Sequence, residues 1–411
     1  MPRISLVVVV FNMHREAPRT LFSLSAEYQC YIGADDYEVI VVDNGSSPPF
    51  DTQVLRKLSG NFRLVRLDSA SPSPAQAVNR GLAEAQHDII GVMIDGARIV
   101  TPGLLHFARH AATLFERSVV ATVGWYLGFD FQRWAIRHGY NQEREDALLA
   151  KIEWPRDGYR LFEIGTPDES SIDGWLQPIA ESNALFMSRR SWNTVGGFDE
   201  RFDEPGGGLV NHDVFRRAVE LPKAELVHLL GEATFHQLHH GVATNSPVEQ
   251  AEANWKRWVR QYEQITGRSY EWPRPRQRPK YVGSLPRPAL LHLARSALFP
   301  VPRALVEGPQ ETTPGSEPPL GRHLSRDLWL DSLATAASPQ TGPLINLMHE
   351  QLRAGRYSAA AGIARLIRQH WPDESESQRV LSFLAPYSPE PWDPVYADTL
   401  SQANELLAEL Q

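Results

Sequence analysis

Cysteine is scarce in this sequence. One cysteine, Cys30, occurs among 411 residues, which excludes an internal disulfide and a cluster of thiolate metal ligands. The chain therefore suits a reducing compartment or is indifferent to redox conditions. We interpret Cys30 as a small, buried apolar residue.

Long hydrophobic runs are also missing. The longest early run, residues 4–11, is shorter than the ~20 residues that span a bilayer. Polar and charged residues follow it without a small-residue cleavage site. We predict a cytoplasmic protein, with peripheral contact to a membrane as a further expectation.

The sequence has no excess of basic charge. It contains 41 Lys and Arg residues against 49 Asp and Glu residues, a formal net charge of −8. Such a chain has no general attraction for polyanions. We therefore exclude a general nucleic-acid-binding protein and predict no nucleic-acid partner.

Four short, almost continuously apolar runs lie within the first 95 residues, and they predict strands buried on both faces. They cover residues 4–10, 37–43, 62–67 and 88–95. Predicted helices separate them at residues 17–26, 53–58 and 74–85. This alternation predicts an α/β fold with a doubly wound, mostly parallel sheet, in which ligands bind beyond the carboxyl ends of the strands.

Polar residues stand where these strands end. Asn12 follows the first strand, Asp43 ends the second within Val-Val-Asp-Asn-Gly-Ser, and Asp95 ends the fourth. A carboxylate at position 43 can accept the imino proton of a base such as uracil or thymine. Asp-Asn-Gly-Ser is equally an ordinary turn after a strand, so both interpretations remain open.

Several short motifs follow one another in a fixed order. They are Phe11-Asn12, Asp43-Asn-Gly-Ser46, Ala77-Val-Asn-Arg-Gly81, Ile94-Asp95, Thr101-Pro102, Ser182 to Ser188, Val195-Gly-Gly-Phe-Asp-Glu200 and His212-Asp-Val-Phe-Arg-Arg217. The ordered set resembles family 2 glycosyltransferases of the GT-A fold over about residues 3–245.

The resemblance implies an inverting glycosyltransferase of the hexosyltransferase type, acting in polysaccharide or glycoconjugate synthesis. The donor is a nucleotide-diphosphate-sugar carrying UDP, dTDP or GDP, and the acceptor is a hydroxyl of a glycan, a lipid-linked sugar or a protein. We predict donor-binding residues at the strand ends and beside them: Phe11, Asn12, Glu16, Asp43, Asn79, Asp95 and Arg98.

The resemblance assigns the role of general base to Asp213, which would deprotonate the acceptor hydroxyl. The alternative for Asp213 is a carboxylate stabilised by the positive end of a helix dipole. On the acceptor side we expect Trp175 to stack on a sugar and Glu181 and His212 to bind it, although buried aromatic residues usually fill cores.

The chain departs from the family where Ala97 replaces the second acid of the Asp-x-Asp motif. Three interpretations are open. In the first, Mn²⁺ or Mg²⁺ is held by Asp95, the diphosphate and His236. In the second, Arg98 replaces the metal by clamping the diphosphate. In the third, the protein is a catalytically silent sugar-nucleotide-binding or scaffold protein. The run from His236 to His240 contains too few further ligands to predict a zinc site.

The predicted domains are a GT-A glycosyltransferase domain over residues 1–250, a basic, proline-rich connector over 251–320 and a helical module over 321–411. The prolines exclude one continuous helix in the connector, which either is solvated or docks on anionic lipid. Helices predicted at 344–354 and 357–370 resemble one tetratricopeptide unit and suggest a protein partner.

Overall fold

The structure of the protein is a computed structural model. It describes residues 1–69, 71–128, 132–137, 139–171, 174–177, 179–239, 241, 248–271, 278–289, 341–353, 357–374, 377–378, 380–381 and 394–410. The chain forms two compact units, Met1–Arg133 with Asn141–Ala289, and Trp134–Tyr140 with Leu290–Gln411.

The described strands of the first unit form one sheet. Its strands are β1 (Ile4–Val10), β2 (Tyr37–Asp43), β3 (Phe62–Arg66), β4 (Ile89–Met93), β5 (Arg98–Val100), β6 (Arg117–Leu127), β7 (Gly165–Pro167), β8 (Leu185–Ser188), β9 (Ala224–His236) and β10 (Lys280–Gly283). Their order is β10-β9-β6-β8-β4-β1-β2-β3, with β5 paired to β9 and β7 to β6.

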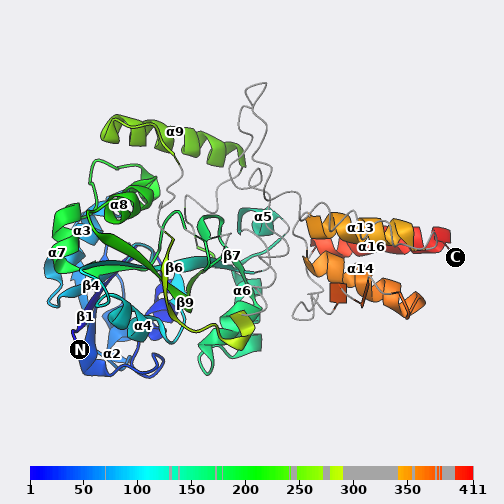
Figure 1. The fold of residues 1–411 in the computed structure, drawn as a ribbon, viewed down its shortest axis with the longest axis horizontal. Helices are drawn as coiled ribbons and strands as arrows, with labels where there is room; N and C mark the ends of the chain where they lie inside the picture. Colours follow the sequence, from blue (N-terminus) through cyan, green and yellow to red (C-terminus); the bar gives the residue numbers. More distant parts are fainter. Residues whose placement is uncertain are drawn as a thin grey trace. The chain divides into compact units, whose positions relative to one another are not determined.

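Helices flank this sheet (Figure 1). They are α1 (Glu16–Phe22), α2 (Thr52–Arg56), α3 (Ala75–Glu84), α4 (Leu104–Ala111), α6 (Gln142–Ile152), α7 (Arg189–Val195), α8 (Val210–Val219) and α9 (Val248–Thr266), with short 3-10 turns η1 (Ala34–Asp36), η2 (Gly158–Glu163), η3 (Glu169–Ser171) and η4 (Pro205–Gly207). Helix α5 (Gln132–Arg137) begins in the first unit, and its residues from Trp134 onward belong to the second. β1 pairs in parallel with both β2 and β4, and β8 runs antiparallel to β4. The predicted α/β class with a mostly parallel sheet is confirmed.

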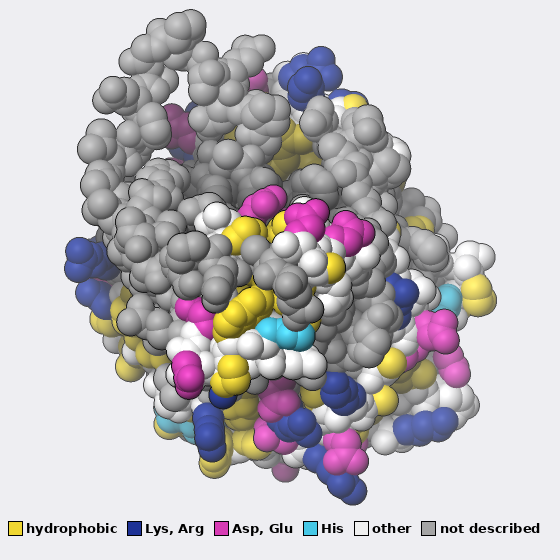
Figure 2. Space-filling view, turned by 90° about the vertical axis from the view of Figure 1, so that its right-hand side faces the viewer, with side chains coloured by type: hydrophobic (Ala, Val, Ile, Leu, Met, Phe, Trp, Pro, Cys, Tyr) yellow, Lys and Arg dark blue, Asp and Glu magenta, His cyan; other side chains and the backbone are white. Residues whose placement is uncertain are grey.

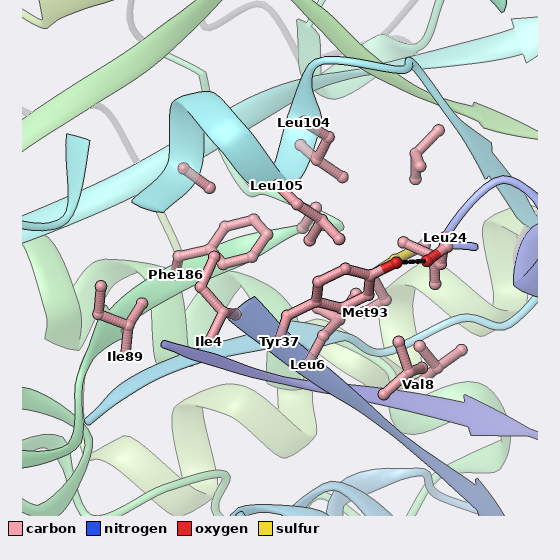
Figure 3. Close-up of a cluster of buried hydrophobic side chains, with 14 of the residues drawn as sticks. Ile4, Leu6, Val8, Leu24, Tyr37, Ile89, Met93, Leu104, Leu105 and Phe186 are labelled. Atoms are coloured by element: carbon pink, nitrogen blue, oxygen red, sulfur yellow. Dashed lines mark hydrogen bonds between the residues drawn. The ribbon is translucent and has the colours of Figure 1, made fainter. Parts of the chain in front are cut away.

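The hydrophobic core lies where β1 and β2 meet helices α1 and α4 (Figure 3). Leu6 and Val8 of β1 share this core with Leu104 of α4, and all three are fully buried. Tyr37 is buried too, and its hydroxyl donates to the carbonyl oxygen of Leu24 at 2.7 Å. The continuous apolar runs predicted this burial correctly, since the other face of β1 is covered as well.

Helix α3 covers that other face and depends on a glycine. A Cβ at Gly81 would collide with Cγ1 of Val7 on β1 and would lie 3.1 Å from Cγ2 of Val42 on β2. The missing side chain therefore lets the helix backbone approach the sheet closely.

The first unit reaches Ala289, beyond the boundary predicted at residue 250. Within the supposed connector, α9 is a continuous helix because the prolines begin only at residue 273. Trp258 and Tyr262 on one face of α9 are 8% and 2% exposed. Burial of this amphipathic face makes α9 part of the folded unit.

The basic residues near α9 pair with acids of the same unit. Arg257 lies 3.1 Å from Glu204, and Arg268 lies 3.3 Å from Glu220. On the face shown in Figure 2, Lys and Arg side chains lie among Asp and Glu side chains. These pairs favour the solvated interpretation of residues 251–271 over docking on anionic lipid. The rest of the predicted connector, from 290 to 320, lies outside the described residues.

The second unit contains α13 (Gly342–Arg353), α14 (Tyr357–His370) and α16 (Pro394–Leu410). The first two helices lie where the sequence predicts them and pack on each other. Their resemblance to a tetratricopeptide unit stays a prediction, as does a protein partner. Residues 321–340 of the predicted module lie outside the described residues.

Two further observations concern the surface. Cys30 is exposed, so the prediction that it is buried is wrong: it lies in the loop that follows α1 rather than in a core element. Among the described helices, none combines the length and hydrophobicity needed to cross a bilayer.

We predict that Gly81→Ala lowers the free energy of unfolding by about 1–3 kcal/mol, because the added methyl group overpacks the contact between α3 and the sheet. Urea denaturation followed by circular dichroism measures this change. Gly33→Ala is the control, because its added Cβ meets only Asp36 Oδ2, at 3.5 Å, and its effect should stay within about 0.5 kcal/mol. Equal stability of the two variants would contradict the close packing of α3.

Candidate functional site

The candidate site lies at the carboxyl end of β4. Asp95 follows β4 by two residues, and the strand order reverses between β1 and β4, the position where α/β sheets bind ligands. A Cβ at Gly96 would lie 2.6 Å from the carbonyl oxygen of Val9. The loop that carries Asp95 therefore rests against the end of β1.

Strand β9 brings two histidines to the same place. Arg98 of β5 pairs with His236, the last residue of β9, in an antiparallel ladder. Asp95 Oδ2 lies 3.0 Å from His236 Nε2 and 3.8 Å from His239 Nε2. The two Nε2 atoms lie 3.0 Å apart, and one ligand atom from each of the three residues fits within 4.8 Å.

The proton positions on these histidines follow from their partners. His236 Nδ1 lies 2.7 Å from Gln132 Oε1, which can accept the hydrogen of that nitrogen when the imidazole is neutral and so leave the lone pair on Nε2. Burial lowers the pKa of His236 to about 4, against the attraction of Asp95. Burial also opposes a charge on His239, but the Asp95 carboxylate outweighs it and raises the pKa of His239. The neutral imidazole of His236 and the carboxylate of Asp95 offer ligand atoms that a cation can bind, and at His239 such a cation would take the place of a proton.

A second buried acid, Asp168, lies on the far side of Arg98. Arg98 Nε is 3.5 Å from Asp95 Oδ2, and Arg98 Nη1 is 3.7 Å from Asp168 Oδ2. Burial raises the pKa of Asp168 to about 6, Arg98 opposes the rise, and Glu181 and Glu169 add to it. The sequence analysis missed Asp168, because it lies in a short irregular segment without a periodic pattern.

The peptide groups of Leu238, between the two histidines, are held by α6 and by the residue before α1. The Leu238 N–H donates to Glu145 Oε2 at 2.8 Å, while Arg15 and Gln142 donate to the Leu238 carbonyl oxygen at 3.3 and 3.2 Å. Glu16, predicted to bind the donor, is buried and accepts bonds from Arg15 and Gln142. The structure gives Glu16 a supporting role in this network instead.

Asp43 is fully buried and serves its own loop. Its Oδ1 accepts the N–H of Ser46 at 2.8 Å, and its Oδ2 accepts the N–H of Phe50 and Arg66 Nη1. Asn12, in the left-handed region with φ 52°, holds the same loop, since its Oδ1 accepts the N–H of Ser47. The turn interpretation of Asp43 therefore describes this structure, and direct recognition of a base does not.

Phe11 and Asn79, which are also predicted to bind the donor, differ in whether they are available to a ligand. Phe11 is 43% exposed beyond the end of β1, so its ring is available to a ligand. Asn79 binds the loop after α7: its Nδ2 donates to the carbonyl oxygen of Phe198, and its Oδ1 accepts the Phe198 N–H. Asn79 therefore positions a loop in this structure.

Asp213 lies in the first turn of α8 and is engaged by a guanidinium. Arg217 donates to Asp213 Oδ2 from Nε at 2.8 Å and from Nη2 at 2.6 Å. The same guanidinium donates to the carbonyl oxygens of Val195 and Gly197. The pair anchors α8 to the loop at Val195 and Gly197. The position of Asp213 agrees with the helix-dipole alternative, whereas the ion pair with Arg217 was not predicted.

The predicted acceptor residues separate in the structure. Glu181 and His212 lie together, with Nε2 of His212 3.7 Å from Glu181 Oε2. Trp175 is 2% exposed, packs against Trp125, and donates from Nε1 to the carbonyl oxygen of Glu232. Stacking of Trp175 on a sugar is therefore wrong for this structure, because its ring belongs to the core.

Comparison with known proteins agrees with this architecture. The model of the glycosyl transferase family 2 matches residues 5–159, which include β1 to β6 and the Asp95 loop. The protein is a glycosyltransferase. Its predicted enzyme class is therefore confirmed. No curated protein matches the sequence of this glycosyltransferase well enough to count as a relative.

The solved structures that match this glycosyltransferase share little sequence with it. TarS 1–349 of S. aureus in complex with UDP-GlcNAc is 13% identical, with a TM-score of 0.41 over 86% of this chain and 88% of that one. The mannosyltransferase PcManGT from Pyrobaculum calidifontis, in complex with GDP-Man and Mn²⁺, is 16% identical, with a TM-score of 0.37 over 93% and 86%. Glucosyl-3-phosphoglycerate synthase from Mycobacterium tuberculosis is 17% identical, with a TM-score of 0.38 over 66% and 81%.

The residues of the glycosyltransferase fit a divalent cation. One carboxylate oxygen and two imidazole nitrogens are ligands that Mn²⁺ accepts, whereas Mg²⁺ prefers an all-oxygen set. Two buried N–H donors beside them, Arg98 Nε and Gln132 Nε2, have no hydrogen-bond partner in the described structure; such donors suit an anion rather than the cation itself. The sequence analysis named Asp95 and His236 as protein ligands, and the structure adds His239 to them.

We predict that Arg15→Met lowers the free energy of unfolding by about 3 kcal/mol at pH 8, because it leaves the buried Glu145 carboxylate without its guanidinium. Urea denaturation monitored by tryptophan fluorescence measures the loss. Arg19→Met is the matched control, because Arg19 contacts Asp146 only at the network's edge and should cost at most about 1 kcal/mol. A similar loss in both variants would show that the Leu238 network adds nothing beyond surface charge.

Proposed function

We propose that this glycosyltransferase moves a sugar from a nucleotide-diphosphate-sugar to an acceptor hydroxyl, with inversion at the anomeric carbon. The observation that carries the proposal is the cluster of Asp95, His236 and His239 at the ligand-binding edge of the sheet. A diphosphate needs a cation there, and the matched family transfers glycosyl groups.

Asp95, His236 and His239 would hold Mn²⁺. When bound, the ion neutralises negative charge on the leaving nucleoside diphosphate. Arg98 is 6% exposed and lies between the carboxylates of Asp95 and Asp168. This position favours the metal over the alternative in which Arg98 itself clamps the diphosphate, and it gives Arg98 the task of balancing buried negative charge.

The nucleoside would lie beside the ends of β1 and β2. There the exposed ring of Phe11 offers a stacking surface for a base. Asn12 and the Asp43 loop are joined through Ser46 and Ser47, which keeps this rim in place. Asp43 then acts through the loop that it holds, and the nucleotide is UDP, dTDP or GDP.

A catalytically silent nucleotide-binding or scaffold protein is the alternative that Ala97 suggests. The two histidines weaken that alternative, because they supply the ligands that the missing acid does not. The acceptor hydroxyl belongs to a glycan, a lipid-linked sugar or a protein.

We predict that Mn²⁺ together with a nucleotide-sugar stabilises the wild-type protein, since a ligand at 100 times its Kd adds ~2.7 kcal/mol. UDP-, GDP- and dTDP-sugars are compared in a thermal-shift assay, each with Mn²⁺ and with chelator. Asp95→Ala and His239→Ala should abolish the metal-dependent shift because each removes a ligand.

Glu116→Gln serves as the control, since Glu116 is exposed and pairs with Lys223 away from the cluster, and it should retain the full shift. A full metal-dependent shift in Asp95→Ala would remove the proposed metal site. The absence of a shift with every nucleotide in the wild type would favour the scaffold alternative.

A further inference from the structure

The acid that the sequence assigns as general base is poorly placed for that work. The Arg217 guanidinium binds one oxygen of Asp213 from two nitrogens, and it also donates to the carbonyl oxygen of Gly197 in the loop after α7. Proton uptake by Asp213 would cancel the charge that holds this partly buried pair together. The charged and polar groups on which Asp213 acts include Arg201 and Tyr262, and neither belongs to the Asp95 cluster.

Glu181, by contrast, precedes a strand whose sheet register leads back toward the Asp95 end of β4. β8 runs antiparallel to β4 with Leu185 opposite Val92. The residues that precede Leu185 therefore run beside those that follow Val92, toward Asp95. Ser182 fixes this segment, because its hydroxyl donates to the carbonyl oxygen of Thr122 and accepts the Thr122 N–H.

The charges link Glu181 to the same cluster. After burial, Glu181 is one of the groups that raise the pKa of Asp168 to about 6. Asp168 in turn lies 3.7 Å from Arg98, which reaches Asp95. Glu181 thus acts on Asp168, and Arg98 lies between Asp168 and Asp95.

The Glu181 carboxylate is oriented by a hydrogen bond from a neutral side chain rather than by an ion pair. Its Oε2 accepts a hydrogen bond from Asn211 Nδ2 at 2.6 Å, and 21% of the side chain is exposed. Burial lowers the pKa of His212, its other neighbour, so the imidazole is neutral at pH 7. The His212 ring is itself held by the Tyr270 hydroxyl, 2.9 Å from Nδ1. Glu181 is therefore an oriented carboxylate with no described cation bound to it.

We propose that Glu181, rather than Asp213, is the base that takes the proton from the acceptor hydroxyl. The assignment rests on the proposed function. The acceptor O–H proton passes to the Glu181 carboxylate while the acceptor oxygen bonds to the anomeric carbon. The bond from that carbon to the diphosphate oxygen breaks, and its electron pair leaves with the nucleoside diphosphate. Asn211 and His212 are positioning residues that orient the carboxylate.

The test compares Glu181→Gln with Asp213→Asn, using the nucleotide-sugar that gives the largest thermal shift and Mn²⁺. Water is the acceptor, and release of nucleoside diphosphate is measured together with the donor-induced shift. Glu181→Gln should keep the shift but lose about 100-fold or more in rate, the range of general-base catalysis. Asp213→Asn should unfold at lower temperature, yet its rate below that temperature should stay within about threefold of wild type.

Rescue separates a base from a structural residue. Added formate should restore part of the rate of Glu181→Ala, because a small carboxylate can occupy the vacated space, and it should leave Asp213→Ala unchanged. Glu116→Gln controls for loss of a negative charge. A near-wild-type rate in Glu181→Gln, or formate rescue of Asp213→Ala alone, overturns the assignment while the proposed function stands. A wild type that releases no nucleoside diphosphate from any donor overturns both.

Discussion

The antiparallel pairing of β5 with β9 is the contact on which the site depends. It sets Arg98 opposite His236, and the ladder continues past the strand end through the bond from the Gln237 N–H to the Ala97 carbonyl oxygen. Residues from distant parts of the sequence thereby face one another across main-chain hydrogen bonds. The fold itself, rather than a local motif, brings the imidazoles to Asp95.

Buried charge is the second constraint. Arg98 lies between Asp95 and Asp168, and Arg15 lies between Glu145 and Asp146. Each guanidinium stabilises the ionised form of a buried carboxylate, whose burial without a charged partner would cost free energy of folding. The first centre belongs to the proposed metal site. The second centre, at Arg15, holds the Leu238 peptide between His236 and His239. The same ion pairs that stabilise the fold therefore also position the proposed metal ligands.

The sequence predicts best where burial is continuous. β1 and β2 have their predicted bounds because their apolar runs are unbroken, and the same pattern places Asp95 at a strand end. The sequence analysis did not predict α9, because it judged residues 251–320 as one connector by the prolines that follow the helix. Trp175 was assigned to the acceptor because composition does not distinguish a core ring from a binding ring.

The roles of single acids were harder to predict than their positions. The four-residue spacing of Asp213 and Arg217 is visible in the sequence and is typical of a helical ion pair, which was a usable signal. Asp168 carried no such signal in the sequence. It comes near Arg98 only in the folded sheet, where β7 and β9 both pair with β6. His239 was present in the histidine run, but its third ligand, Asp95, becomes a neighbour only through the β5–β9 ladder.

The account's central claim is that Asp95, His236 and His239 jointly bind the metal beside the nucleotide. Anomalous diffraction from crystals grown with Mn²⁺ and a nucleoside diphosphate tests it most directly. We predict a manganese peak within about 2.3 Å of Asp95 Oδ2 and both Nε2 atoms, with diphosphate oxygens completing the coordination. A bound nucleotide with no manganese at these three residues would contradict the claim.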